Sequence, residues 1–168
     1  MMLAVDPGIR GCGVALFEAR ELRAAAYVPN MARSGNGPRE CWLMASSINV
    51  WVAHTIANER LDRLVLEWPQ VYAPGKGKGD PNDLFALAGI GAALCAELKP
   101  FEIEHYLPRA WKGQMPKEVV HQRMLTELSQ DEFAKIRSAG RLTHNVWDAV
   151  SLGLFSLDRL TPKRVIAR

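Results

Sequence analysis

Short apolar runs separated by turn-forming residues open the sequence and predict three strands. The first run, residues 2–5 (MLAV), stops at residues 6–8 (DPG), where proline and glycine together mark a turn. A second run follows at 14–19 (VALFEA), and a third extended segment covers 21–28. Three closely spaced strands joined by tight turns are typical of an antiparallel meander.

Beyond the meander, helical and strand patterns alternate along the chain. Apolar residues recur near helical spacing over 39–57, and a second helix is expected over 82–98 with Asn82 as its N-cap. The apolar run 61–67 (LDRLVLE) and the alternating segment 101–107 (FEIEHYL) predict two further strands. Each of these two strands follows a helix, as crossover-linked strands do.

The remaining segments predict loops and the last helices. Loops are expected over 30–38 and 68–81, and the segment 108–117 is expected to be irregular. One helix is expected over 117–128 and the last over 143–160, beginning at an N-capping threonine. The order of elements predicts an α/β fold. Its mixed five-stranded sheet, with three antiparallel and two crossover-linked strands, carries helices on both faces.

The composition bounds the class of protein. The chain has 168 residues and a mass of 18.7 kDa, which suits one domain, expected over 1–160. Hydrophobic residues make up 48% and charged residues 23%, which excludes a disordered or collagen-like chain. The net charge of +3 matches the three basic residues of a C-terminal tail, 161–168. Such a tail contacts nucleic acid or is simply a solvated end.

The cysteines and the lengths of the apolar segments indicate the cellular compartment of the protein. Cys12, Cys41 and Cys95 form no CxxC pair, which favours a reducing compartment over a zinc site or a disulfide framework. No window approaches ~20 consecutive apolar residues, and the N-terminal apolar run is too short for a signal peptide. We therefore expect a cytoplasmic protein with no membrane partner.

Three acidic residues stand where acids are uncommon. Asp6 and Glu67 end apolar strands, and Asp148 lies within the apolar segment VWDAVSLGL. Each alone is most simply a turn, cap or salt-bridge residue, but carboxylates brought together repel each other unless a cation lies between them. Their oxygens suit Mg²⁺, and two such ions can support phosphodiester hydrolysis. Together the three acids favour a metal site.

Four segments also carry a resemblance to a known family. In this order they resemble the RuvC-type Holliday-junction resolvases, which belong to the ribonuclease H-like (retroviral integrase) superfamily. The resemblance extends from Met2 to about Leu154 and implies the ribonuclease H-like fold. Its most specific pieces are the DPG turn followed by GxG and the helix that carries Asp148. The segments are LAVDPGIRGCGVALFE, VLEWPQVYAPGKGKGDPNDLFALAGIGAAL, YLPRAWKGQMPKEVV and HNVWDAVSLGL.

The resemblance implies a set of catalytic metal ligands. Asp6, Glu67 and Asp148 match three ligand positions of the family. A fourth ligand, Asp or His, commonly lies three residues before the last Asp, where this chain has Asn145, with His144 one residue earlier. Both positions share the side of a helix with Asp148. We prefer His144, because imidazole binds metals or transfers protons whereas Asn is a weak neutral ligand.

The resemblance further places basic residues beside this site. Lys112 and Lys117 flank the stretch GQMP and would act in catalysis by holding the scissile phosphate. The stretch is shorter than in the bacterial enzymes, so the register of Lys117 stays open. Whether the protein comes from a bacterium or a bacteriophage also stays open. Arg109 is a candidate for DNA binding. For each of these residues a solvated surface cation is the plain alternative.

The segment 75–79 (GKGKG) is rich in glycine and lysine. No Ser or Thr follows Lys76 or Lys78, so the spacing of a P-loop fails and we expect no nucleotide cofactor. Both lysines are instead expected to contact DNA phosphates. Tyr72 resembles the aromatic residue that the family places near the junction centre, where it would stack on an unpaired base. Its alternative role is to pack the loop down.

These features predict a metal-dependent crossover junction endodeoxyribonuclease. It would use Mg²⁺, or alternatively Mn²⁺, with two ions per active site, and would nick four-way DNA junctions symmetrically during recombination and repair. The family resemblance implies a homodimer. Two alternatives stay open. One is a ribonuclease H-like nuclease acting on structured RNA, and the other is a non-catalytic junction-binding protein, which Asn145 in place of an acid would favour.

Overall fold

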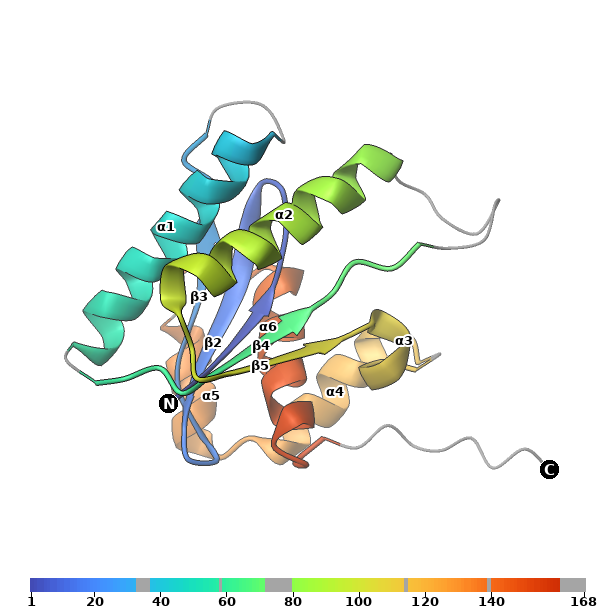
Figure 1. Cartoon of the computed structure of the whole chain (residues 1–168). Coiled ribbons are helices and arrows are strands. Elements are labelled where there is room, and N and C mark those ends of the chain that lie inside the picture. Colours follow the sequence, from blue (N-terminus) through green and yellow to red (C-terminus); the bar gives the residue numbers. More distant parts are fainter. Residues whose placement is uncertain (33–36, 58, 72–79, 114, 139, 161–168) are drawn as a thin grey trace.

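A computed structural model of the chain has five strands in one mixed sheet with the order β3-β2-β1-β4-β5 (Figure 1). The structure describes residues 1–32, 37–57, 59–71, 80–113, 115–138 and 140–160. β1, β2 and β3 form the predicted antiparallel meander. β4 pairs with β1 and β5 pairs with β4, both in parallel, which confirms the predicted sheet. The strands are β1 (Met2–Asp6), β2 (Gly11–Glu18), β3 (Glu21–Pro29), β4 (Arg63–Glu67) and β5 (Glu102–Tyr106).

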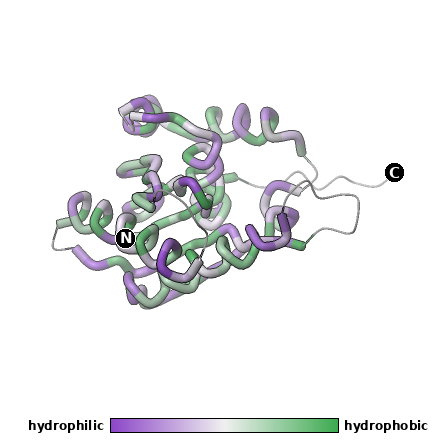
Figure 2. Tube along the Cα trace, turned by 90° about the horizontal axis from the view of Figure 1, so that it is seen from above, coloured by the Kyte–Doolittle hydropathy of each residue, from purple (hydrophilic) through white to green (hydrophobic). Residues whose placement is uncertain are grey.

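Helices cover both faces of this sheet. α1 and α2 lie together on one face, and α6 crosses the other face with α4 and α5 beside it (Figure 1). In Figure 2, hydrophobic and hydrophilic residues alternate along the helices. The helices are α1 (Pro38–Ile56), α2 (Pro81–Leu98), α3 (Pro108–Trp111), α4 (Lys117–Glu127), α5 (Gln130–Arg137) and α6 (His144–Ser156).

No helix in the described ranges has both the length and the apolar composition that crossing a membrane requires. The predicted C-terminal tail, 161–168, lies outside the described residues.

The central strand, β1, is buried on both faces, which explains its continuous apolar sequence. Leu3 and Val5 pack into the core beneath α1 and α2, whereas Met2 and Ala4 pack into the core beneath α6. Asp6 is the last residue of this strand and is only 5% exposed. Burial of the strand on both sides therefore fixes the place of the Asp6 carboxylate at the end of the sheet.

The start of α2 and the segment after β5 differ from the prediction. The N-cap of α2 is Asp80 and not Asn82, because the Asp80 carboxylate accepts a hydrogen bond from the Asn82 backbone N–H at 2.9 Å. Pro81 takes the first helical position, where its missing N–H costs nothing. The segment 108–117, predicted to be irregular, contains the single turn of α3 and the start of α4.

The C-terminal helices also differ from the predicted pattern. α5, which the sequence pattern did not predict, begins at a capping box: the Ser129 hydroxyl accepts from the Glu132 N–H, and the Glu132 carboxylate accepts from the Ser129 N–H. α6 ends at Ser156 and not near Leu160, because the chain turns at Asp158, whose φ is 54°. Thr143 occupies the predicted N-cap position of α6, but its hydroxyl forms no capping hydrogen bond.

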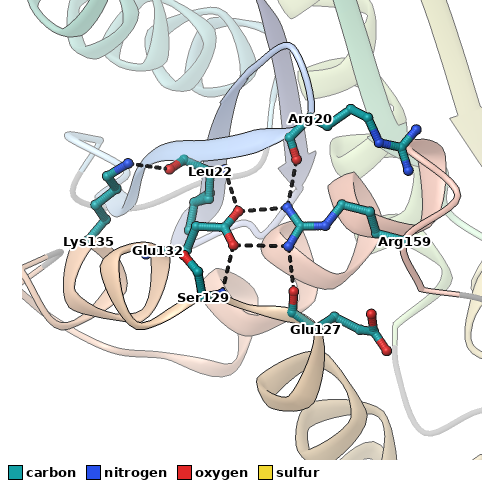
Figure 3. A network of polar contacts seen from close by, with 7 residues as sticks. All are labelled: Arg20, Leu22, Glu127, Ser129, Glu132, Lys135 and Arg159. Atoms are coloured by element: carbon teal, nitrogen blue, oxygen red, sulfur yellow. Dashed lines mark hydrogen bonds and ion pairs between the residues drawn. The ribbon is translucent and has the colours of Figure 1, made fainter.

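A buried ion pair joins α5, the β2–β3 hairpin and the segment that follows α6 (Figure 3). The Glu132 side chain is 4% exposed and lies 2.7 Å from the Arg159 guanidinium. The same carboxylate accepts from the backbone N–H groups of Leu22, at 2.7 Å, and Ser129, at 2.9 Å. Arg159 also donates to the carbonyl oxygen of Arg20. Because each charge has several hydrogen bonds, this pair escapes the usual penalty of a buried ion pair.

Burial disfavours the charged form of Glu132, but the hydrogen bonds from Arg159 and from the two backbone N–H groups outweigh burial and lower the pKa to about 2. A depressed pKa in the folded state stabilises the protein at pH values above the unfolded pKa, which is about 4.3 for Glu. This stabilisation is lost as the pH falls from there toward 2.

We predict that Glu132→Gln lowers the free energy of unfolding at pH 7 by about 2 kcal/mol, because the amide cannot replace the charge. The difference from the wild type should shrink below about pH 4. Urea denaturation at pH 7 and at pH 3 measures both effects. Glu59→Gln is the matched control, since Glu59 pairs with Arg23 on the surface and should change stability by less than about 1 kcal/mol. Equal stability of the two variants at pH 7 would contradict the prediction.

Candidate active site

Two of the three predicted acids end adjacent parallel strands, and the third lies on the helix that crosses them. Asp6 and Glu67 are the last residues of β1 and β4, and the pairing of Val5 with Leu66 places them at the same edge of the sheet. Asp148 lies one turn into α6 and is 5% exposed. The carboxyl ends of parallel strands are where α/β sheets generally place their binding sites.

The Lys112 ammonium links two of these carboxylates. Its Nζ lies 2.9 Å from Glu67 Oε2 and 3.0 Å from Asp148 Oδ2. Trp111, the last residue of α3, donates its indole N–H to Glu67 at 2.8 Å, and its ring lies 4.5 Å from the Lys112 ammonium. The turn after β5 therefore delivers both a cation and a hydrogen-bond donor to the site.

The sequence analysis missed His121. Its Nε2 lies 3.2 Å from Asp148 Oδ1, and its ring packs at 6.1 Å from that of Trp147. His121 lies one helical turn after Lys117, at the start of α4. Because residues four apart share a helix face, the predicted helix over 117–128 held a signal for this contact.

The pKa values of these groups reflect their burial and the opposite charges around them. Burial disfavours ionisation of Asp148, but the hydrogen bonds from His121 and Lys112 outweigh burial and lower its pKa. In Glu67 burial prevails over the attraction to Lys112 and raises the pKa. Burial also disfavours the Lys112 ammonium, but the charges of Glu67, Asp148 and Asp6 raise its pKa. One ammonium thus faces three carboxylates.

Close packing at a glycine brings α6 to this site. Gly13 pairs with Asp6 in the sheet, and a Cβ atom at Gly13 would lie 1.9 Å from the carbonyl oxygen of Asn145. Only glycine allows the first turn of α6 to lie so close to β2. The Asn145 side chain lies over the turn that follows β1, since a Cβ at Gly8 would be 2.9 Å from its Nδ2. His144 is exposed.

For the other predicted site residues, the structure gives at most an element or an exposure. Arg109 is exposed on α3, and Lys117 begins α4. Tyr72, Lys76 and Lys78 lie outside the described residues. The choice between His144 and Asn145 as a ligand stays a prediction, as do the roles of all these residues.

Comparison with solved structures identifies the fold. The structure superposes on the yeast mitochondrial Holliday junction resolvase Ydc2 with a TM-score of 0.61 and 11% identity, over 95% of this chain and 78% of that one. For Thermus thermophilus RuvC in complex with Holliday junction substrate the TM-score is 0.60 and the identity 19%, over 91% of this chain and 89% of that one. The chain has the fold of the RuvC resolvases.

A second Thermus thermophilus RuvC structure matches this fold with a TM-score of 0.53 and 18% identity, over 96% of this chain and 98% of that one. No family model and no curated protein matches the sequence. The RuvC-like fold therefore rests on structural likeness.

Carboxylate oxygens are ligands that divalent cations prefer, and Asp6, Glu67 and Asp148 supply them at this end of the sheet. Among the described residues, no three His, Cys, Asp or Glu side chains form a ready-made metal group. The Lys112 ammonium instead lies where Glu67 and Asp148 attract a cation. Burial is the main cause of the raised pKa of Glu67, and a divalent cation bound here would favour the ionised form of this carboxylate.

We predict that Lys112→Met, measured in chelator at pH 7, lowers the free energy of unfolding by about 2 kcal/mol, because two partly buried carboxylates then face each other without a counter-charge. Their pKa values should rise, so the loss of stability should shrink as the pH falls and the carboxyls protonate. Denaturant unfolding across this pH range is the measurement. Arg109→Met, on the exposed side of α3, is the control. Unchanged stability of Lys112→Met at pH 7 would refute this view of the site.

Proposed function

We propose that this protein is a metal-dependent endonuclease that resolves four-way (Holliday) DNA junctions by symmetric phosphodiester hydrolysis. The observation that carries the proposal is the convergence of Glu67 and Asp148 on Lys112, beside Asp6, at the carboxyl end of the sheet. The likeness of the fold to Ydc2 and RuvC, whose structures are those of Holliday junction resolvases, supports it. The reaction proposed is that of a crossover junction endodeoxyribonuclease.

Asp6, Glu67 and Asp148 would hold the metal, with His144, or alternatively Asn145, as the fourth ligand. When bound, Mg²⁺ or Mn²⁺, with two ions per site, supplies Lewis-acid stabilisation of the charge that develops during phosphodiester hydrolysis. Asp148 is prepared for this role because its lowered pKa keeps it ionised.

Lys112 has a separate role on the substrate. Its raised pKa keeps the ammonium charged at neutral pH, and its two carboxylate partners hold it at the site. With a metal ion held by the carboxylates, the ammonium would be available to a phosphate oxygen, where it would stabilise the negative charge of the transition state. Trp111 holds Glu67 in place by its indole hydrogen bond. Lys117 would contact the same phosphate.

A homodimer is part of this proposal, because two symmetric nicks require two active sites. The helices on the face opposite α6 offer surface for such contact: Trp42 and Val50 of α1 are 52% and 56% exposed, and Phe85 of α2 is 77% exposed. Exposed apolar side chains of this size are typical of protein interfaces.

The deciding experiment is a nicking assay on a synthetic four-way junction, with linear duplex, an RNA–DNA hybrid and a structured RNA alongside, in Mg²⁺ and in chelator. We expect paired nicks on the junction that chelator abolishes. Asp6→Asn should still bind the junction but lose nicking by at least about a hundredfold, because a metal ligand is gone. Asp131→Asn, on the exposed side of α5, is the matched control and should nick normally.

The other outcomes select the alternatives. Preferential cleavage of RNA or the hybrid would move the function to RNA processing with the same site. Tight junction binding by the wild type without cleavage in Mg²⁺ or Mn²⁺ would favour the binding protein. Normal nicking by Asp6→Asn would refute the proposed ligand set.

We predict that His121→Ala weakens Mg²⁺ binding about tenfold or more, because Asp148 loses the hydrogen bond that orients it. His121→Gln, which keeps an N–H donor, should recover part of the affinity. A Mg²⁺ titration followed by tryptophan fluorescence measures binding directly, since Trp111 and Trp147 both contact the site residues. His54→Ala, on the exposed end of α1, is the control. An unchanged Mg²⁺ midpoint for His121→Ala would show that His121 does not position Asp148.

A further inference from the structure

The loop between β1 and β2 is held firmly against the end of β3. The Tyr27 hydroxyl donates to the carbonyl oxygen of Arg10 at 3.0 Å. The Asn30 side chain donates to the carbonyl oxygen of Ile9 at 3.0 Å, and the Asn30 backbone N–H donates to Arg10 at 3.1 Å. Three hydrogen bonds from one strand end therefore fix the backbone of the loop that follows Asp6.

Tyr27 lies directly over a glycine in this loop. A Cβ atom at Gly11 would be 2.4 Å from the Tyr27 Cζ and hydroxyl atoms, and the φ of Gly11 is +155°. No other residue would leave room for the ring. The guanidinium of Arg141, from the segment just before α6, lies over the Tyr27 ring with its Cζ 5.2 Å from the ring centroid. Cation–π contact of this kind restrains a long side chain on the surface.

Arg10 and Arg141 are both exposed, and in the described part of the chain neither forms an ion pair. By contrast Arg23, Arg63 and Arg159 are each paired with a carboxylate. The charges of those three arginines are neutralised, whereas Arg10 and Arg141 keep theirs available to an external anion. The Tyr27 ring restrains the Arg141 guanidinium, which therefore loses less entropy when it binds phosphate, and the hydrogen bonds to the Arg10 carbonyl fix the backbone of Arg10.

The two arginines lie at the same end of the sheet as the carboxylates. The loop of Arg10 directly follows Asp6, and Tyr27 pairs with Gly13, which pairs with Asp6. Tyr27 is therefore two strands from Asp6, or about 10 Å at the usual strand spacing. That distance corresponds to about three base pairs along a duplex.

We propose that Arg10, whose backbone Tyr27 fixes, and Arg141, whose guanidinium lies over the Tyr27 ring, bind the sugar–phosphate backbone of the DNA about three nucleotides from the bond that is cut, on the β3 side of the active site. This inference rests on the proposed function and adds to it a named contact surface. The substrate strand would cross the end of the sheet, with Arg10 and Arg141 on the β3 side of the carboxylates. Such contacts set position and carry no sequence information.

The test is the salt dependence of junction binding in chelator, where no strand is cut. Each lost phosphate contact should reduce the slope of log K against log salt by about 0.9. The double variant Arg10→Ala/Arg141→Ala should therefore bind at least tenfold more weakly at low salt and show a slope smaller by about 2. Arg20→Ala is the matched control, because this exposed arginine lies in the β2–β3 hairpin at the opposite end of the sheet.

Tyr27→Ala provides a second variant. It keeps both arginines but removes the ring under Arg141 and the hydrogen bond to the Arg10 carbonyl. It should weaken binding less than the double variant and leave the slope nearly unchanged. Circular dichroism and thermal unfolding of each variant check that the fold persists.

The outcomes separate this inference from the proposed function. Failure of the wild type to bind junction or duplex DNA would overturn both. Wild-type binding with an unchanged slope and affinity in the double variant would overturn only the role of Arg10 and Arg141. The same loss in Arg20→Ala as in the double variant would also overturn it, because the effect would then come from net charge alone.

Discussion

The repulsion among carboxylates at the end of the sheet is the constraint around which this site is built. Asp6 and Glu67 end two neighbouring strands, and α6 adds Asp148 above them. Without a cation these charges would oppose the packing of α6 on the sheet. Lys112 lies between two of them in the free protein and keeps the arrangement folded. The same position makes the site selective for cations, since any occupant must replace an ammonium.

Packing at two glycines makes that arrangement possible. Gly13 lies under the first turn of α6, and a Cβ at Gly153, near the other end of the helix, would lie 2.1 Å from the Phe17 ring. Both contacts are with β2, so the helix lies close along its whole length. The DPG turn and the glycines that follow it thus have a mechanical role. They allow the helix that carries Asp148 to approach the strand that carries Asp6.

The mixed sheet and the three carboxylates could be predicted from the sequence, because hydrophobic periodicity and the place of an acid within it are local properties. Asp6 and Glu67 were found as acids that end apolar runs, and Asp148 as an acid in an apolar helix. The contact of Trp111 with Glu67 could not be found in this way, because it depends on how the turn after β5 folds. Helical spacing from Lys117 indicated the face that carries His121, but the contact of His121 with Asp148 depends on how α4 packs against α6. Nor does any local pattern pair Glu132 with Arg159. Such pairs join residues that only tertiary packing brings together.

The buried pair of Glu132 and Arg159 joins segments that lie far apart in the sequence. The carboxylate reaches back 110 residues to Leu22, and its partner lies near the end of the described chain. Contacts so distant in sequence form late and slowly. On the ribosome, the strands that carry Asp6 and Glu67 emerge long before Asp148 and Arg159. A nascent chain therefore cannot assemble the three carboxylates until the segment that carries Asp148 has been synthesised.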